Sequence, residues 1–78
     1  MKVAVVSPEQ VLFDGEATQV VTRTTEGDVA FLSNHAPFLG ALAAGETRVY
    51  LADGSIERFD IEGGFVEVSN DTVSILVS

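Results

Sequence analysis

The sequence predicts an all-β domain, built as a sandwich or a barrel of short strands. Turn-forming residues recur every seven to twelve positions along the chain. The runs between them are rich in Val, Thr, Ile and Phe, and several alternate polar and apolar side chains as half-buried strands do. The turn signals are Ser7-Pro8, Asp14-Gly15, Glu26-Gly27, Ser33-Asn34, Gly45-Glu46, Asp53-Gly54, Gly63-Gly64 and Asn70-Asp71.

The first third of the chain has the pattern of strands joined by glycine turns. The opening run Val3–Val6 is apolar but too short for a signal peptide, and no stretch is long enough to span a membrane. Asp14-Gly15 and Glu26-Gly27 each place a glycine where a tight turn needs one. We therefore expect Gly15 and Gly27 to be structural turn residues.

Residues 34–45 allow two interpretations. A short helix could begin with Asn34 as its N-cap and end just before Gly45. Gly40 inside that helix would cost about 1 kcal/mol relative to alanine. Extended structure is therefore the favoured prediction, and the helix is the alternative.

The next segment predicts a β-hairpin. Val49 and Leu51 share one face of an alternating run, and Asp53-Gly54 follows as a two-residue turn in which both positions accept a positive φ. In the returning strand, Ile56 is out of phase with the apolar residues that come after it. This mismatch predicts a bulge.

The last third predicts two more strands. Gly63 and Gly64 form a bare pair, which favours a tight bend where the missing Cβ allows close packing. The acids after them alternate with valines, as on a solvated strand face. In residues 72–75, the alternation places Val73 and Ile75 inward and the hydroxyl side chains outward.

Size and charge restrict the possible functions. The 78 residues, 46% of them hydrophobic, predict one domain over residues 1–78 with a thin core. Ordering costs of about 1.5 kcal/mol per residue nearly cancel the gain from burial, so a partner that covers apolar surface would matter. The net charge of −8 argues against nucleic acid and direct lipid binding and favours a basic patch on another protein. Without cysteine there is neither a disulfide framework nor thiolate chemistry.

His35 is the only histidine, and nothing in its spacing marks a reaction centre. Ser7 or Ser33 and any of the twelve acids could complete a triad on paper, but no spacing singles out such a set. A lone histidine lacks the clustered ligands of a zinc site, and no loop has calcium spacing, so we expect no metal and no cofactor. Lys2, the only lysine, lies at the start of the chain, which argues against a biotin or lipoate carrier.

Five motifs follow one another in order: Val6-Ser7-Pro8-Glu9, Phe13-Asp14-Gly15, Glu26-Gly27-Asp28, His35-Ala36-Pro37, and the Gly63–Val68 stretch with the terminal Thr72–Ser78. Together they resemble the epsilon subunit of the F-type ATP synthase over essentially the whole chain. Two departures concern turns: Ser33-Asn34 stands where the family has Pro-Gly, and Ala30 replaces a usual glycine. Asparagine tolerates left-handed backbone angles, so we expect the turn to survive.

The resemblance implies a β-sandwich of about ten strands in two packed, largely antiparallel sheets. In the family this domain lies at the foot of the central stalk, packs against the gamma subunit, touches the c-ring and rotates with them. It performs no reaction and supports the coupling of proton flow to ATP synthesis. The expected location is peripheral, on the cytoplasmic face of the bacterial plasma membrane or the equivalent organelle membrane.

Family members typically continue into two C-terminal helices that inhibit ATP hydrolysis and in some bacteria bind ATP. This chain stops at Ser78, so we carry over neither inhibition nor nucleotide binding.

The resemblance also implies two contact sites. The candidate c-ring contacts are Glu26 and Asp28, which could pair with an arginine in the polar loops of the ring; the alternative is that these acids only solubilise the turn. The expected contribution of such an exposed pair is about 0–1 kcal/mol. The candidate gamma contacts are Ser7, His35, Ala36, Pro37, Phe38 and Leu39.

Three alternatives remain open at the sequence level. His35 could be a hydrogen-bonded structural residue rather than a contact for gamma. The domain could be a free-standing sandwich that binds a ligand or a peptide, although one Tyr and no Trp give little for a sugar to stack on. It could also be a hydrolase that uses His35, and loss of turnover in His35→Ala would support that function.

Overall fold

The computed structural model describes all 78 residues, which form nine β-strands and no helix. The all-β prediction is confirmed, with nine strands where about ten were expected. Residues 38–42 form a strand, so the extended interpretation is correct and the helical alternative is wrong. The strands are β1 (Lys2–Val6), β2 (Val11–Glu16), β3 (Gln19–Thr24), β4 (Gly27–Leu32), β5 (Phe38–Leu42), β6 (Gly45–Tyr50), β7 (Ile56–Ile61), β8 (Gly64–Ser69) and β9 (Thr72–Val77).

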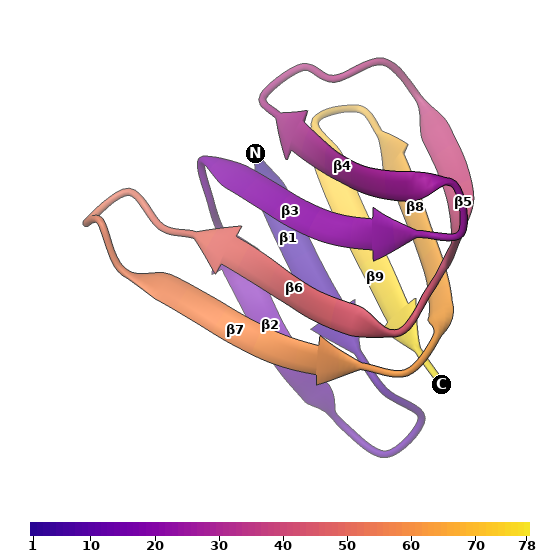
Figure 1. The fold of residues 1–78 in the computed structure, drawn as a ribbon. Coiled ribbons are helices and arrows are strands. Elements are labelled where there is room, and N and C mark those ends of the chain that lie inside the picture. Colours follow the sequence, from indigo (N-terminus) through magenta and orange to yellow (C-terminus); the bar gives the residue numbers. More distant parts are fainter.

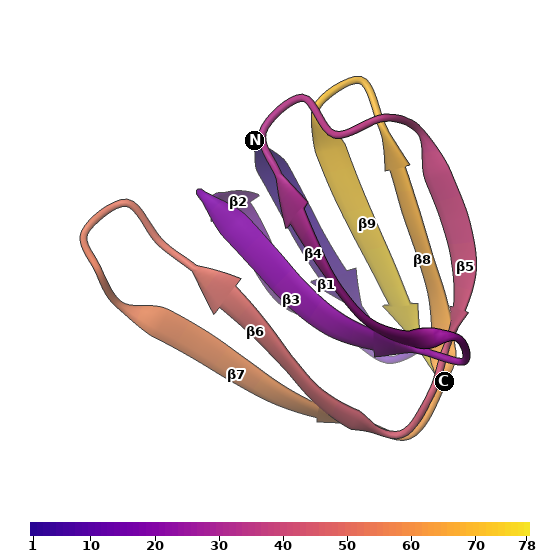
Figure 2. The same ribbon diagram turned by 45° about the horizontal axis from the view of Figure 1, so that its top comes forward.

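The strands form two layers (Figure 1). One layer is a five-stranded sheet in the order β2-β1-β9-β8-β5, and the other is a four-stranded sheet in which β3 lies between β4 and β6, with β7 at the edge. A single pair, Thr24 with Leu42, joins them through β3 and β5. Every pairing is antiparallel except that of β1 with β9. From the joined corner the four-stranded sheet splays away toward β7 (Figure 2).

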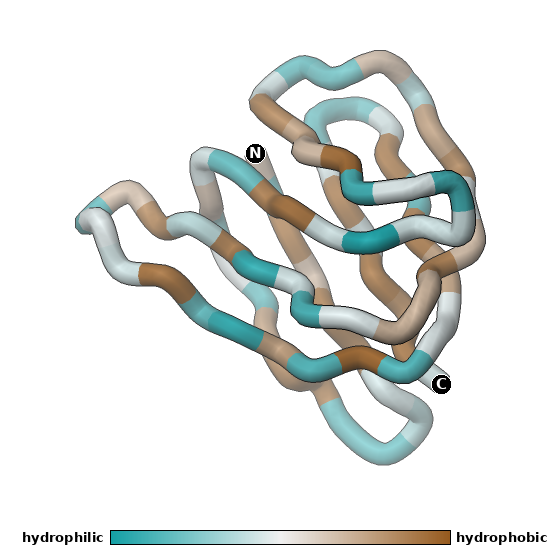
Figure 3. The backbone as a smooth tube through the Cα atoms, viewed as in Figure 1, coloured by the Kyte–Doolittle hydropathy of each residue, from teal (hydrophilic) through white to brown (hydrophobic).

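The core lies between the layers and follows from the alternation of the strands. In β9, Val73 and Ile75 are fully buried, while Thr72 and Ser74 point outward, as predicted. Burial alternates in the same way along β1, β3, β6 and β8. Figure 3 shows hydrophobic stretches on the strands of both layers. No helix in the chain is long and apolar enough to cross a membrane. The buried hydrophobic residues are Val3, Val5, Ala17, Val20, Phe31, Leu42, Val49, Ile61, Val66, Val68, Val73 and Ile75.

The expected turn at Gly15 is wrong. Gly15 lies inside β2 and pairs with Val3, and the chain reverses after Glu16 instead. Its backbone is extended, so the glycine there does not report a turn. Gly27 and Gly64, in contrast, each begin a strand just after a reversal, with φ of 122° and 133°.

The β6–β7 connection differs from the predicted two-residue turn. Of its two central residues only Gly54 has a positive φ, and the loop spans residues 51–55. The Asp53 carboxylate shapes it by accepting hydrogen bonds from the Ser55 amide (2.9 Å) and hydroxyl (2.6 Å). A turn with positive φ at both central residues occurs instead at Asn70 (51°) and Asp71 (57°), between β8 and β9.

The bulge expected near Ile56 is also wrong. β7 pairs with β6 in unbroken register, and Ile56 is out of phase because it lies on the outer face beside Tyr50. The irregularity occurs in the pairing of β1 with β2, between Val5 and Val6.

Candidate protein-docking site

His35 lies in the loop between β4 and β5 and is held there by local contacts. Its backbone N–H donates to the Leu32 carbonyl (3.2 Å), and its Nδ1 lies 2.7 Å from the Ala36 carbonyl oxygen. A carbonyl only accepts, so Nδ1 carries the proton. The imidazole meets the buried Phe31 edge-on, with ring centroids 4.9 Å apart. No hydroxyl or carboxylate side chain contacts the ring as a hydrogen-bond partner, and these contacts fit the structural role.

The loop around His35 is further held from the opposite side. Asn34 adopts a left-handed φ of 63°, which asparagine tolerates, so the expected turn is present. Its backbone N–H donates a hydrogen bond to the Asp71 carboxylate (2.7 Å). This bond ties the β4–β5 loop to the β8–β9 turn next to the His35-Ala36-Pro37 segment.

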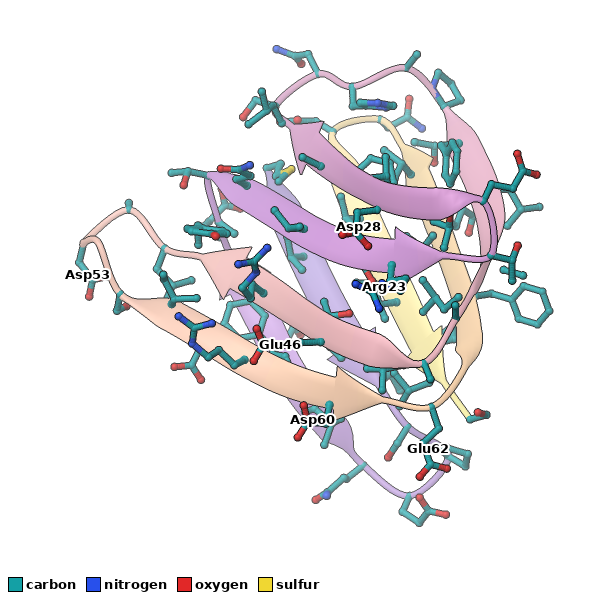
Figure 4. The ribbon with its side chains drawn as sticks, in the orientation of Figure 1. Arg23, Asp28, Glu46, Asp53, Asp60 and Glu62 are labelled. Carbon is teal, nitrogen blue, oxygen red and sulfur yellow. The ribbon has the colours of Figure 1, made fainter.

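The acidic turn between β3 and β4 is internally braced. The Thr24 hydroxyl donates to the Gly27 carbonyl (2.8 Å) and accepts from the Glu26 amide (3.1 Å). On the outer face, Arg23 Nε donates to Asp28 Oδ1 at 2.9 Å, and the two side chains point toward one another (Figure 4). That hydrogen bond, with the positive charge of Arg23, holds the pKa of Asp28 below its usual value. The same hydrogen bond, with the negative charge of Asp28, raises the pKa of Arg23. The two predicted ring contacts therefore differ, because Glu26 is exposed and has no ion pair.

Five apolar side chains form a row across the outer face of the five-stranded sheet, one from each strand. In order they are Ala41, Phe65, Leu76, Val6 and Val11, and each pairs directly with the next. Phe65, Leu76 and Val11 are 58%, 55% and 61% exposed. At a strand spacing of about 4.8 Å, the row is about 19 Å long. We call these residues the apolar row.

The sequence reasoning missed the apolar row, although it left a signal. Phe65 and Leu76 occupy outward positions in alternating strands, where Glu67 and Ser74 show the polar residues expected there. A contiguous group of apolar residues in outward register, in contrast to single ones, is typical of an interaction surface. Leu39, a predicted gamma contact, is 74% exposed on the same face, beside Glu67.

The predicted gamma contacts do not form one cluster. His35 to Leu39 lie at the start of β5, whereas Ser7 follows the end of β1, and the pairings put these at opposite ends of the five-stranded sheet. The Ser7 hydroxyl donates to the backbone carbonyl of Gln10 and accepts from the backbone N–H of Gln10 (both 3.2 Å). These hydrogen bonds shape the β1–β2 turn. A partner could touch both groups only by covering the face between them.

The outer face of the four-stranded sheet is charged instead. Glu46 accepts a hydrogen bond from Arg58 (3.1 Å) and lies 3.9 Å from Arg48, beside the pair of Arg23 and Asp28. Nowhere do three His, Cys, Asp or Glu side chains come together in a way that could hold a metal ion. The two outer faces thus differ sharply in polarity.

A two-layer sandwich with a braced acidic turn and an apolar row on one outer face places the chain in a class of protein, the small all-β sandwich domains. The particular family follows from comparison. The sequence profile of the family described as "ATP synthase, Delta/Epsilon chain, beta-sandwich domain" matches residues 1–78, and the chain belongs to this family.

The similar curated proteins are ATP synthase epsilon chains. The chain is 45% identical over 76 residues to the ATP synthase epsilon chain of Frankia casuarinae, and the alignment covers 97% of this chain and 89% of that protein. It is 40% identical over 75 residues to that of Chlorobium limicola, covering 96% and 85%. The sodium ion specific epsilon chain of Propionigenium modestum is also 40% identical, but there the match spans 54% of the relative.

Solved structures agree on the fold. A chain of the Euglena gracilis mitochondrial ATP synthase, in an OSCP/F1/c-ring assembly, superposes with a TM-score of 0.90 at 25% identity, covering 96% of this chain and 48% of that one. A chain from the central stalk and c-ring of the Tetrahymena thermophila enzyme gives 0.82 at 20% identity, covering 99% and 62%, which bears on the fold alone.

Proposed function

We propose that this chain is a non-catalytic rotor subunit of an F-type ATP synthase that links the gamma subunit to the c-ring. In this role it supports the coupling of proton flow to ATP synthesis. The complex holds it peripherally on the cytoplasmic face of the bacterial plasma membrane, or on the equivalent organelle membrane. Family membership supports the assignment, as does the origin of the similar Euglena gracilis chain from an ATP synthase assembly that includes the c-ring.

The apolar row is the observation that carries the gamma contact. Three large apolar side chains more than half exposed on one sheet face are a poor choice for a free monomer but suit the dry centre of an interface. Gamma covers this face and reaches the His35–Leu39 segment along β5. Ser7 lies at the other end of the same face, so one partner spanning it accounts for both groups of predicted contacts.

The test measures the affinity for purified gamma of a Phe65→Thr/Leu76→Thr variant. Threonine keeps the β propensity and removes most of the apolar area, so we expect affinity to fall about ten-fold or more. The matched control is Leu32→Thr, because Leu32 is 56% exposed on the outer face of the other sheet. Equal losses in both variants, or none in either, would remove the gamma contact from this face.

The c-ring contact belongs to the acidic turn in this proposal. Its carboxylates lie on a braced hairpin beside the start of the gamma face, so one domain can meet both partners. An exposed ion pair contributes about 0–1 kcal/mol, which sets register more than affinity. A Glu26→Lys/Asp28→Lys variant should bind gamma normally yet fail to restore ATP synthesis in membranes that lack the native chain. Full restoration would exclude the turn as the ring contact.

A further inference from the structure

One edge of β4 is unpaired, because β4 is bonded to β3 alone. Residues opposite each other in an antiparallel pair exchange both backbone hydrogen bonds at every second position. Thr24 and Gly27, on either side of the two-residue turn, form such a pair. The N–H and C=O groups of Asp28, Ala30 and Leu32 therefore point away from β3. We call these groups the free edge of β4.

Hydrogen bonds beyond the β3–β4 ladder agree with this direction and show which groups remain available. The Arg23 carbonyl accepts from the Ala43 N–H (2.9 Å), so Arg23, which lies opposite Asp28, also points its backbone away from the pairing. At the end of β4 the Leu32 carbonyl already accepts from an N–H of the β4–β5 loop (3.2 Å). Asp28 and Ala30 make no backbone hydrogen bond outside the sheet. At these two residues the free edge offers two N–H donors and two C=O acceptors in line.

The strands at the two ends of the sheet, β2 and β7, carry features that hinder further pairing, and β4 does not. Edge strands are kept from adding another strand by bulges, by exposed charges and by charges that point toward the core. β2 pairs with β1 in an irregular register, and β7 places Glu57 opposite the buried Val49. The only charged side chain of β4, Asp28, is paired with Arg23. β4 is thus the edge that is open to an added strand.

The surface beside the free edge indicates what pairs with it. Between the start of β4 and β5 lies a groove of about 300 Å³, with Val29, Phe38 and Leu39 on its apolar side. The ring of Phe38 packs against the buried ring of Phe31, with centroids 5.3 Å apart. Phe38 and Leu39 are among the predicted gamma contacts, so the groove continues the surface proposed for gamma. A second copy of this chain is a poor occupant, because two chains of net charge −8 repel each other.

We propose that an extended segment of the gamma subunit adds to the free edge of β4 as a further β-strand. Its backbone pairs with Asp28 and Ala30, and an apolar side chain of the segment enters the groove beside Val29 and Phe38. The pairing ends before the engaged Leu32 carbonyl, so the Leu32 side chain lies beyond it. The inference rests on the proposed function and adds that gamma is recognised through backbone groups as well as through the apolar row.

The experiment measures the affinity of the full chain for purified gamma. Ala30→Pro removes one N–H donor from the free edge and spares the β3–β4 ladder, to which that N–H does not contribute. We expect the affinity to fall about ten-fold, since the lost hydrogen bond leaves an acceptor of gamma unpaired. Ala30→Val keeps the donor and favours the strand, so it should bind within about two-fold of the wild type. Circular dichroism checks that both variants keep their β-sheet.

Hydrogen exchange of the wild type tests the same pairing without a substitution, and it alone decides if Ala30→Pro does not fold. The amides of Asp28 and Ala30 should exchange fast in the free chain and slowly in the complex with gamma, whereas those of β7 should be unaffected. If these amides gain no protection, or if folded Ala30→Pro binds like the wild type, strand addition is wrong and the gamma contact still stands. An equal loss in Ala30→Val would assign the effect to the side chain and overturn the backbone pairing as well. If the wild type does not bind gamma, the proposed function itself fails.

Discussion

Gly64 is the residue whose backbone tolerates substitution least. Its φ of 133° lies where L side chains rarely occur, and a Cβ there would run into the Leu76 carbonyl across the β8–β9 ladder. We expect Gly64→Ala to lower the free energy of unfolding by more than about 2 kcal/mol in urea titrations. Gly15→Ala is the control, because its new Cβ would meet only the Phe13 ring at an ordinary 3.6 Å. Comparable losses in both would refute the strain assigned to Gly64.

Two buried threonines make the one polar contact inside the core. Thr22 and Thr47, 2% and 1% exposed, join their hydroxyls across β3 and β6 at 2.7 Å. Thr22→Val leaves the Thr47 hydroxyl without that partner and should cost about 1–3 kcal/mol, whereas Thr22→Val/Thr47→Val should be nearly neutral. A double-mutant cycle by chemical denaturation checks this. A double variant as unstable as the sum of both singles would show that the pair is not coupled.

The braced acidic turn makes stability depend on pH. The pKa of Asp28 is lowered in the folded chain by the hydrogen bond from Arg23. Its contribution is therefore complete above the unfolded value of about 3.9 and is lost as the pH falls through the lower folded pKa. Asp28→Asn should lower the free energy of unfolding at pH 6, and the difference from the wild type should vanish as the pH falls below the folded pKa of Asp28. Glu57→Gln, which has no ion pair to lose, should show no such convergence.

At the residue scale, the sequence singled out candidate site residues but not the side chains that surround them. His35, Glu26 and Asp28 could be singled out from residue type and motif. The hydrogen bonds at and beside these residues could not be predicted. Arg23 reaches Asp28 across the β3–β4 hairpin, and Asp71 comes close to Asn34 only in the folded chain. That Asp28 is ion-paired while Glu26 is not could therefore be seen only in the structure.

Two connections between strands act as one unit. The Asp71 carboxylate in the β8–β9 turn accepts a hydrogen bond from the backbone N–H of Asn34 in the β4–β5 loop. Asp71 itself has a left-handed φ of 57°. Asp71→Gly should relieve the left-handed angle yet release the loop, so the Asn34 amide should exchange hydrogen faster. Asp71→Asn retains an acceptor and should protect that amide nearly as well. Equal exchange rates in all three chains would show that the bond does not hold the loop.

The strands were more predictable than their connections. Alternation in β6 and β9 correctly gave the buried faces of Val49, Val73 and Ile75, because the period of two is local. Turn type was harder, since Asp53-Gly54 has the residues of a tight hairpin but is drawn into a wider loop by Ser55. The partner of β1 was beyond prediction, because parallel pairing with β9 leaves no local pattern.

For the molecule as a whole, the thin core leaves little redundancy. Phe31 is the largest fully buried side chain, and it contacts the rings of both His35 and Phe38. Phe31→Ala should cost about 3–5 kcal/mol, comparable with the whole stability of a domain this small. We expect it to be largely unfolded at 25 °C by circular dichroism. Leu39→Ala, at a 74% exposed position, should melt like the wild type.

The parallel pairing of the first strand with the last has a consequence for biosynthesis. Lys2 lies beside Thr72 and Val6 beside Leu76, so the middle of the five-stranded sheet is assembled from the two extremes of the chain. On the ribosome, β1 can pair only with β2 until residues 72–77 have left the exit tunnel. The sandwich can thus close only after β9 has been synthesised, and until then the valines of β1 are open to contact with other unfinished chains.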